Sequence, residues 1–294
     1  MLKRREFLWC GLPLTAAARE GLTIIDTHAH IYSEDEKRYP TTAKPLRPPA
    51  GTGTVAHLKR MLAENGVARA CIVQTSTFYR FDNRFICDTA VAEREWTAGV
   101  CTLDPDDARS PAVLREFARK YGIRALRSIP GKDGRMDSPG VQELWKAAGD
   151  SRLIVNVLCG GNNADAVAGM LEKFARQPVV LDHCMNLRAG QDHGSVLADL
   201  LRIAKYPNAH AKLTFLATGS AEPYPFRDLH DSCRRLITAY TPGRCVWGSD
   251  FPCELWTRKA TYSQNLRLFT AELGLEDAAK KAILGDTARR LYFS

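Results

Sequence analysis

The chain has 294 residues, of which 45% are hydrophobic and 25% charged, a composition typical of a globular enzyme. This composition excludes fibrous, collagen-like and largely disordered proteins, and one α/β barrel of about 250 residues would account for most of the length. The formal net charge is +8, but the lysines and arginines are scattered and no nucleic-acid-binding motif accompanies them. We therefore expect no nucleic-acid partner, and a small, anionic molecule as the substrate.

The nine cysteines show no C-x-x-C spacing of the kind found in zinc knuckles and redox motifs. Several of them stand in apolar runs, so we interpret them as buried, unpaired thiols. No segment reaches the roughly 20 apolar residues of a membrane span, and we expect no stable membrane association. The sequence leaves the oligomeric state open and allows a homo-oligomer.

The N-terminus, residues 1–20, differs in character from the rest of the chain. Residues 3–8, Lys-Arg-Arg-Glu-Phe-Leu, resemble a twin-arginine export signal, and Ala16-Ala17-Ala18 resembles a small-residue cleavage site. This pattern predicts a periplasmic protein. The apolar stretch between the two motifs is short, so a flexible basic tail on a cytoplasmic protein is the alternative. We assign residues 21–294 to one domain.

From residue 22 onward, short β-branched runs alternate with longer amphipathic stretches, which is typical of βα units around a parallel sheet. The predicted strands are 22–27, 68–73, 97–103, 122–126, 153–158, 179–183, 209–213 and 245–249. The predicted helices include 55–65, 111–121, 141–149, 164–176, 196–205 and 226–240, with a C-terminal helix over 276–292. Eight such units predict a single-domain TIM (β/α)8 barrel. An open doubly wound sheet is less favoured because no glycine-rich phosphate turn follows the first strand.

The connection from Tyr32 to Thr54 is too long for an ordinary βα loop. On a barrel it would cross the face where active sites lie. A disordered surface insert is the alternative interpretation.

His28 and His30 follow the first predicted strand, separated by one residue. Side chains alternate along a strand, so both rings point the same way and emerge at the C-terminal end, where barrel enzymes place catalytic groups. Two converging imidazoles suit a divalent cation such as zinc.

Asp250 and His183 end two other predicted strands. Asp250 can complete a metal site with His28 and His30, act as the general base on water, or do both. His183 can orient the substrate or polarise a scissile carbonyl, although a lone histidine at a strand end is often only structural.

Four further residues are candidates for binding the substrate: Arg124, Arg127, Asn156 and Tyr79. Guanidinium groups at the end of the fourth strand could hold a substrate carboxylate. The alternation with Leu126 favours Arg124 over Arg127 as the one that faces the pocket, and bracing of the barrel wall is the alternative role.

For four other polar side chains, the neighbouring sequence indicates where they lie. Lys212 is a charged residue in the apolar seventh strand and is either structural or directed at the substrate. The remaining histidines that lie in helical or loop patterns, His57, His193 and His230, are predicted to be surface residues.

These motifs together resemble the lactonase-like branch of the amidohydrolase-related family, metal-dependent hydrolases with a TIM-barrel fold. The resemblance rests on the segments 26–30 (Asp-Thr-His-Ala-His), 122–124 (Gly-Ile-Arg), 181–184 (Leu-Asp-His-Cys), 247–252 (Trp-Gly-Ser-Asp-Phe-Pro) and 283–292. It implies that His28 and His30 occupy the first-strand metal position, His183 the sixth-strand position and Asp250 the position of the eighth-strand catalytic aspartate.

The chain departs from the binuclear members of that family. Its fifth strand offers only Asn156 and Cys159 where they have a histidine ligand, and its fourth strand lacks the bridging lysine or glutamate. The resemblance therefore implies one divalent metal, with zinc the first choice, or metal-free hydrolysis.

We predict a hydrolase that opens a lactone or similar cyclic ester of a carboxylated small molecule, using water activated by Asp250. One alternative is metal-dependent, non-oxidative decarboxylation of an aromatic acid, which the missing fifth-strand histidine disfavours. A non-catalytic barrel that binds a carboxylated ligand is the alternative from another class.

Overall fold

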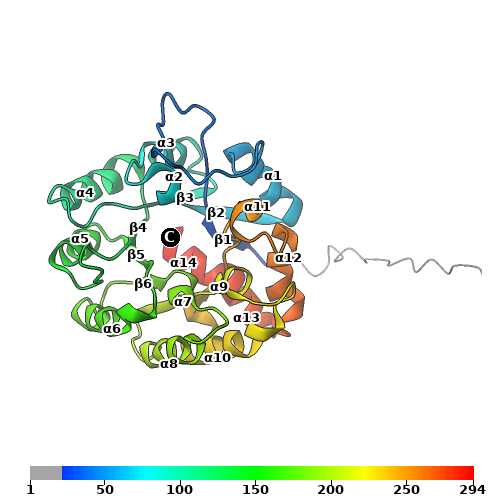
Figure 1. Cartoon of the computed structure of the whole chain (residues 1–294). Helices are drawn as coiled ribbons and strands as arrows, with labels where there is room; N and C mark the ends of the chain where they lie inside the picture. Colours follow the sequence, from blue (N-terminus) through cyan, green and yellow to red (C-terminus); the bar gives the residue numbers. More distant parts are fainter. Residues whose placement is uncertain (1–21) are drawn as a thin grey trace, which may run out of the picture.

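Eight parallel strands alternate with helices in the computed structural model, which describes residues 22–294, and each strand pairs with the next in the order of the sequence (Figure 1). The strands are β1 Ile24–Ala29, β2 Val67–Val73, β3 Thr97–Cys101, β4 Ala125–Ser128, β5 Ile154–Val157, β6 Val179–Leu181, β7 Ala209–Lys212 and β8 Cys245–Val246. The Thr27 N–H donates to the Trp247 carbonyl over 3.1 Å and closes β8 onto β1. The predicted single-domain TIM barrel is therefore confirmed.

Helices form a ring outside the strands, whereas α14 lies at the centre of this ring in the view of Figure 1. Their bounds are α1 Val55–Asn65, α2 Ser76–Tyr79, α3 Arg84–Ala92, α4 Ser110–Tyr121, α5 Pro139–Asp150, α6 Ala164–Lys173, α7 His183–Asn186, α8 His193–Ile203, α9 Phe215–Gly219, α10 His230–Tyr240, α11 Cys253–Trp256, α12 Tyr262–Arg267, α13 Asp277–Lys281 and α14 Thr287–Tyr292. The ends of α1 follow from its sequence: the Thr54 side chain accepts from the His57 N–H, and Gly66 ends the helix with φ 66°. The predicted C-terminal helix is divided by a π-helical segment at Ala282–Asp286.

Alternation along the strands separates two layers of the core. One set of side chains fills the barrel interior, including Ile25, Val73, Val100, Ala125, Ile154, Val180 and Val246, with Ala288 and Tyr292 packed against it. The alternate set, including Leu126 and Leu181, belongs to the larger core shared with the helices. A residue's position along a strand therefore decides whether it points into the barrel or toward the helices.

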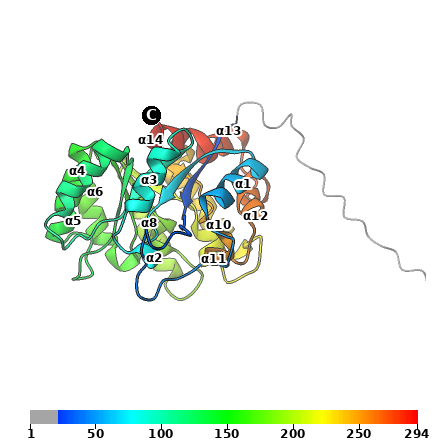
Figure 2. The ribbon, with the colours of Figure 1, turned by 90° about the horizontal axis from the view of Figure 1, so that it is seen from above.

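The long connection after β1 lies over the C-terminal ends of the strands. In Figure 2 this dark blue segment is on the same side as α2 and α11, opposite α13 and α14. The Thr42 N–H donates to the Phe78 carbonyl over 2.8 Å, and Tyr39 packs in an aromatic cluster with Phe78 and Tyr79. Of the two interpretations, a segment over the active-site face is the one that the structure supports.

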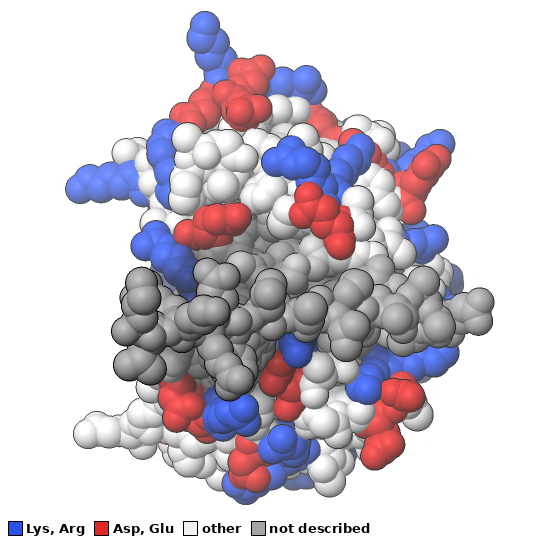
Figure 3. Space-filling view, turned by 90° about the vertical axis from the view of Figure 1, so that its right-hand side faces the viewer, with Lys and Arg blue, Asp and Glu red and all other residues white. Residues whose placement is uncertain are grey.

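The eight cysteines within residues 22–294 are all buried and unpaired, as predicted. None of the helices in this range is both long and apolar enough to cross a membrane. Basic and acidic side chains are interspersed on the face shown in Figure 3. The predicted twin-arginine and cleavage motifs lie outside the described residues.

Candidate active site and metal centre

His28, His30 and Asp250 converge at the C-terminal end of the barrel. The Nε2 atoms of the two histidines are 3.3 Å apart. Asp250 Oδ1 lies 3.4 Å from His28 Nε2 and 3.6 Å from His30 Nε2. All three side chains are buried. The segment after β8 can come this close to β1 because it contains Gly248, where a Cβ atom would lie 2.7 Å from the Cβ of His28.

The three donor atoms fit a single metal ion. Ligand atoms placed 2.0–2.1 Å from a tetrahedral zinc stand roughly 3.3–3.4 Å apart, which matches the observed triangle. Asp250 Oδ1 is buried and has no hydrogen-bond partner within residues 22–294, an uncommon state for a carboxylate oxygen. The Nδ1 atom of His30 lies 2.9 Å from the Val73 carbonyl, so a proton on Nδ1 leaves Nε2 free to act as a ligand.

Burial sets the protonation of this triangle. It lowers the pKa of His28 and of His30 well below the usual value, and the neighbouring cations Lys212 and Arg127 act in the same direction. Burial also raises the pKa of Asp250 to about 7, against the opposing effect of Arg127. The two imidazoles are therefore neutral at physiological pH, which is the state in which histidine binds metals.

Asp26 holds β1 and the segment after β8 together beneath the triangle. Its Oδ1 accepts the backbone N–H groups of His28 over 3.0 Å and of Ser249 over 2.9 Å. Its Oδ2 accepts the hydroxyls of Ser249 over 2.6 Å and of Tyr262 over 2.9 Å. Asp26 lies within the motif noticed in the sequence, but nothing in the sequence indicated these long-range partners.

His183 stands beside the triangle, with its ring centroid 4.7 Å from that of His28. Its Nδ1 is 2.8 Å from the Thr214 hydroxyl, and burial lowers its pKa to about 4. His183 (φ 51°) and Asp250 (φ 55°) both have left-handed backbone conformations. Such conformations are uncommon outside glycine and cluster at functional sites.

Arg127 and Lys212 share one carboxylate below the cavity. Lys212 Nζ lies 2.7 Å from Asp182 Oδ1 and 3.4 Å from His28 Nδ1, and Arg127 Nε lies 3.4 Å from Asp182 Oδ2. Lys212 is fully buried, does not line the cavity, and also donates to the Thr27 carbonyl over 3.0 Å. These contacts favour the structural alternative for Lys212.

A cavity of about 290 Å³ opens directly above these groups and is lined by His30, His183, Asp250 and Arg127. The rest of its lining comes from segments that follow β2, β5, β6, β7 and β8: Thr75, Ser76, Thr77, Leu158, Asn186, Thr218 and Trp256. Trp256 packs over His30 at 5.5 Å between ring centroids. Trp256 was not found from the sequence, because α11 is a short helix without periodicity.

The preference for Arg124 over Arg127 was wrong. Arg124 precedes β4 and lines a separate hollow with Tyr292 and Phe293, at the N-terminal end of the barrel. Arg127 shares the inward face of β4 with Ala125, whereas Leu126 packs outward. The prediction for Arg124 requires Leu126 to point into the barrel. Because Leu126 points outward, Arg127 is the arginine that faces the cavity.

Asn156 and Tyr79 do not reach the cavity. Asn156 is fully buried inside the barrel, where it accepts the Tyr292 hydroxyl over 2.9 Å. The hydroxyl of Tyr79 accepts the Ser33 N–H over 2.7 Å and so fixes the long connection after β1. Both are structural residues here.

Two of the histidines predicted at the surface are buried. His57 packs on Phe251 and its Nδ1 accepts the Gly53 N–H over 3.1 Å, while His230 lies 2.7 Å from the Pro225 carbonyl. His57 is in contact with Gly53 and Phe251 and His230 with Pro225, all outside the helices that carry the two rings, and helical periodicity does not reveal such contacts.

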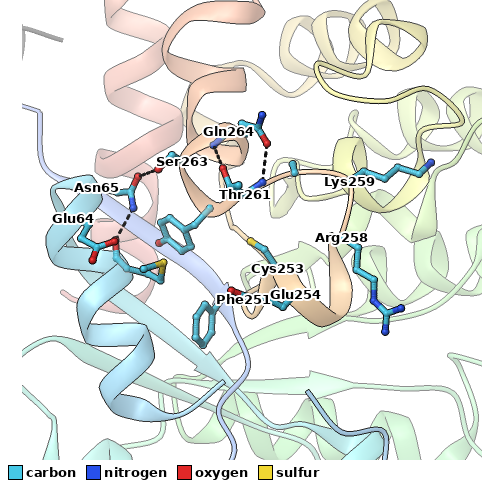
Figure 4. A pocket seen from close by; sticks show the side chains of 13 residues that line it. Glu64, Asn65, Phe251, Cys253, Glu254, Arg258, Lys259, Thr261, Ser263 and Gln264 are labelled. Carbon is cyan, nitrogen blue, oxygen red and sulfur yellow. Dashed lines mark hydrogen bonds between the residues drawn. The ribbon is translucent and has the colours of Figure 1, made fainter. Parts of the chain in front are cut away.

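A larger cavity, of about 640 Å³, lies outside the barrel between α1 and the α11–α12 segment (Figure 4). Two pairs of its polar side chains satisfy one another: Ser263 donates to Asn65 over 2.6 Å, and Thr261 and Gln264 form a reciprocal cap. None of the histidines of the triangle lines it. The larger cavity is therefore separate from the His-His-Asp triangle.

A (β/α)8 barrel with a buried His-His-Asp triangle at the C-terminal ends of its strands defines an enzyme with a candidate metal centre. Residues 25–293 match the Amidohydrolase family, and the chain belongs to that family.

The comparisons found relatives of similar length. The chain is 23% identical to a D-galactarolactone isomerase of Agrobacterium fabrum, with 91% of this chain and 90% of the relative covered. It is 22% identical to a 4-sulfomuconolactone hydrolase of Hydrogenophaga intermedia, with 91% of this chain and 88% of the relative covered.

Solved structures share the fold. A probable 2-pyrone-4,6-dicarboxylic acid hydrolase from Acinetobacter baumannii, with citric acid bound, has a TM-score of 0.76 at 16% identity, covering 92% of this chain and 99% of that one. An amidohydrolase from Burkholderia multivorans with bound zinc has a TM-score of 0.73 at 21% identity, with the same coverage.

Proposed function

We propose that this enzyme hydrolyses a lactone of a carboxylated small molecule. The observation that carries the proposal is the triangle of His28, His30 and Asp250, which opens into a cavity that also contains His183 and Arg127. The relatives named for lactone chemistry support the proposal, because they cover nearly the whole chain.

His28, His30 and Asp250 are the residues that would hold a divalent metal, with zinc the first candidate. When bound, such an ion supplies Lewis-acid stabilisation of negative charge on the carbonyl oxygen and lowers the pKa of a nearby water. The Asp250 oxygen that lacks a hydrogen-bond partner and the neutral imidazoles suit this role.

Three side chains of the protein have separate roles in the proposed reaction. The Asp250 carboxylate accepts a proton from the attacking water, a contribution of about 10²- to 10⁴-fold to the rate. His183, fixed through its Nδ1 by Thr214, orients the lactone carbonyl. Arg127 holds the substrate carboxylate by charge-assisted hydrogen bonds, with Asp182 limiting its movement.

The test combines metal analysis with an activity assay. Purified protein is expected to contain about one zinc or manganese ion per chain, and chelation should abolish hydrolysis of carboxylated lactones until the metal is restored. The same metal content without any lactonase activity would contradict the proposal.

Product analysis separates hydrolysis from the reactions of neighbouring enzymes. Nuclear magnetic resonance of the products distinguishes ring opening from movement of a double bond or of the ring ester. Release of carbon dioxide from an aromatic acid would replace the proposal with decarboxylation.

A further inference from the structure

The cavity contains one cation among hydroxyl and amide groups. Arg127 is the single lysine or arginine among its described lining residues. The remaining polar groups that do not belong to the candidate machinery are three consecutive residues after β2, 75–77, together with Asn186 and Thr218. One guanidinium matches one carboxylate, and uncharged hydroxyl and amide groups match hydroxyls on a ligand.

Polar atoms without partners gather around this cavity. Of the eight buried side-chain atoms that lack a hydrogen-bond partner within residues 22–294, three belong to lining residues: Ser76 Oγ, Asp250 Oδ1 and Arg127 Nε, the last of which is ion-paired with Asp182 Oδ2 at 3.4 Å. Unpaired buried polar atoms are rare in folded proteins and call for an explanation. Ser76 lines the cavity, so a ligand bound there can supply the missing partner of its hydroxyl.

Two apolar walls restrict the shape of the ligand. Leu158 and Trp256 line the cavity, and the Trp256 Nε1–H donates to the Tyr32 hydroxyl over 3.2 Å, which fixes the indole. The volume of about 290 Å³ is just below the range for small-molecule sites, roughly 300–1,000 Å³. These limits favour a ligand with one ring.

We propose that the enzyme selects single-ring lactones that carry one carboxylate and ring hydroxyls, and that Ser76 is the residue that distinguishes hydroxylated from unhydroxylated rings. The proposal rests on the proposed lactone hydrolysis and adds the substrate class. Planar dicarboxylates are disfavoured because a second carboxylate would have no cation in the described lining.

Four lactones form a matched panel. D-glucaro-1,4-lactone has one carboxylate and hydroxyls, D-glucono-1,5-lactone has hydroxyls alone, muconolactone has one carboxylate alone, and 2-pyrone-4,6-dicarboxylate has two carboxylates and no hydroxyl. The expected order of kcat/KM places the first compound at least tenfold above each of the others. Equal or higher kcat/KM for the dicarboxylate would overturn the inference and leave lactone hydrolysis intact.

Ser76→Ala tests the individual residue. We expect kcat/KM for D-glucaro-1,4-lactone to fall about 10- to 100-fold, mainly through KM, while that for muconolactone changes less than twofold, because only the hydroxylated ring loses a hydrogen bond. Ser195→Ala, at an exposed position on α8, is the matched control and should leave both values unchanged. Equal losses on both substrates would show that Ser76 does not read the ring hydroxyls.

Binding to the Asp250→Asn variant, measured by calorimetry, separates the two proposals. Preferential binding of D-glucaro-1,4-lactone without hydrolysis by the wild type would support the substrate class and contradict the hydrolytic function. Neither binding nor turnover of any of the four lactones would overturn both.

Discussion

The two ends of the barrel differ in whether their buried polar groups have hydrogen-bond partners. All the buried side-chain atoms without partners in residues 22–294 lie within the C-terminal half of a strand or in the segment that follows one, as Arg127 and Asp250 do. At the N-terminal end, buried polar groups are paired: the Asn208 side chain donates to the Leu171 and Gln177 carbonyls over 3.2 Å, and His210 Nδ1 lies 3.1 Å from the Asn208 carbonyl.

This difference separates stability from function. The N-terminal end is closed by α14 and its hydrogen bonds stabilise the barrel, whereas the C-terminal end retains buried polar atoms without hydrogen-bond partners, among them Asp250 Oδ1, which can bind a ligand or an ion. Arg124 and Arg127 show the contrast within one strand region: the first is exposed at the closed end and the second is buried at the open end. Four substitutions test the comparison.

Asp250→Asn should have the largest effect. Loss of the proton acceptor is expected to lower kcat/KM for the preferred lactone by about 10²- to 10⁴-fold, while the melting temperature stays unchanged or rises because an unpaired buried carboxylate is removed. Asp231→Asn, at an exposed position on α10, is the control for a change of charge. A similar loss of activity in both variants would contradict the assignment.

Arg127→Lys should raise KM for carboxylated lactones about 10- to 50-fold, because an ammonium group cannot replace the two-pronged guanidinium. Arg124→Lys, at the other end of the barrel, should change KM less than twofold. Steady-state kinetics of the two variants checks this, and a larger effect at Arg124 would reverse the comparison of the two ends.

Tyr292→Phe should affect stability alone. It leaves Asn156 Oδ1 without its donor in the barrel interior, and we expect the free energy of unfolding to fall by about 1–2 kcal/mol. Urea denaturation measures this, with Tyr121→Phe on α4 as the control, while kcat/KM should remain at the wild-type value. A large loss of activity at unchanged stability would show that the two ends are not separable.

His210, near the start of β7, should produce a small effect that depends on pH. Burial lowers its pKa to about 4, so between pH 6.5 and 5.5 the unfolded chain takes up a proton that the folded chain does not. Stability is therefore lost as the pH falls, by about 1 kcal/mol over this interval for one histidine of unfolded pKa about 6.5. His210→Gln should reduce the slope of unfolding free energy against pH by that amount; an unchanged slope would contradict the assignment.

Much of the fold and the centre of the site could be predicted from the sequence. Strand and helix periodicity is local, so the eight βα units and their closure as a barrel followed from it. The parallel arrangement then brings the ends of different strands to one face, which is why His28, His30, His183 and Asp250 were expected together. Their distances agree with a common site, while their individual roles remain proposals.

Only the tertiary structure decided which polar residues face the cavity and which support it. The inward or outward direction of β4 depends on the register of the whole barrel, and a shift of one residue exchanges Arg127 for its neighbours. Apart from the neighbouring His28 N–H, the partners of Asp26, Asp182 and Asn156 come from segments 26 to 236 residues away: Asp182 pairs with Asn156, and Asp26 with Tyr262. Local sequence patterns contain no information on such contacts, because packing of the complete barrel creates them.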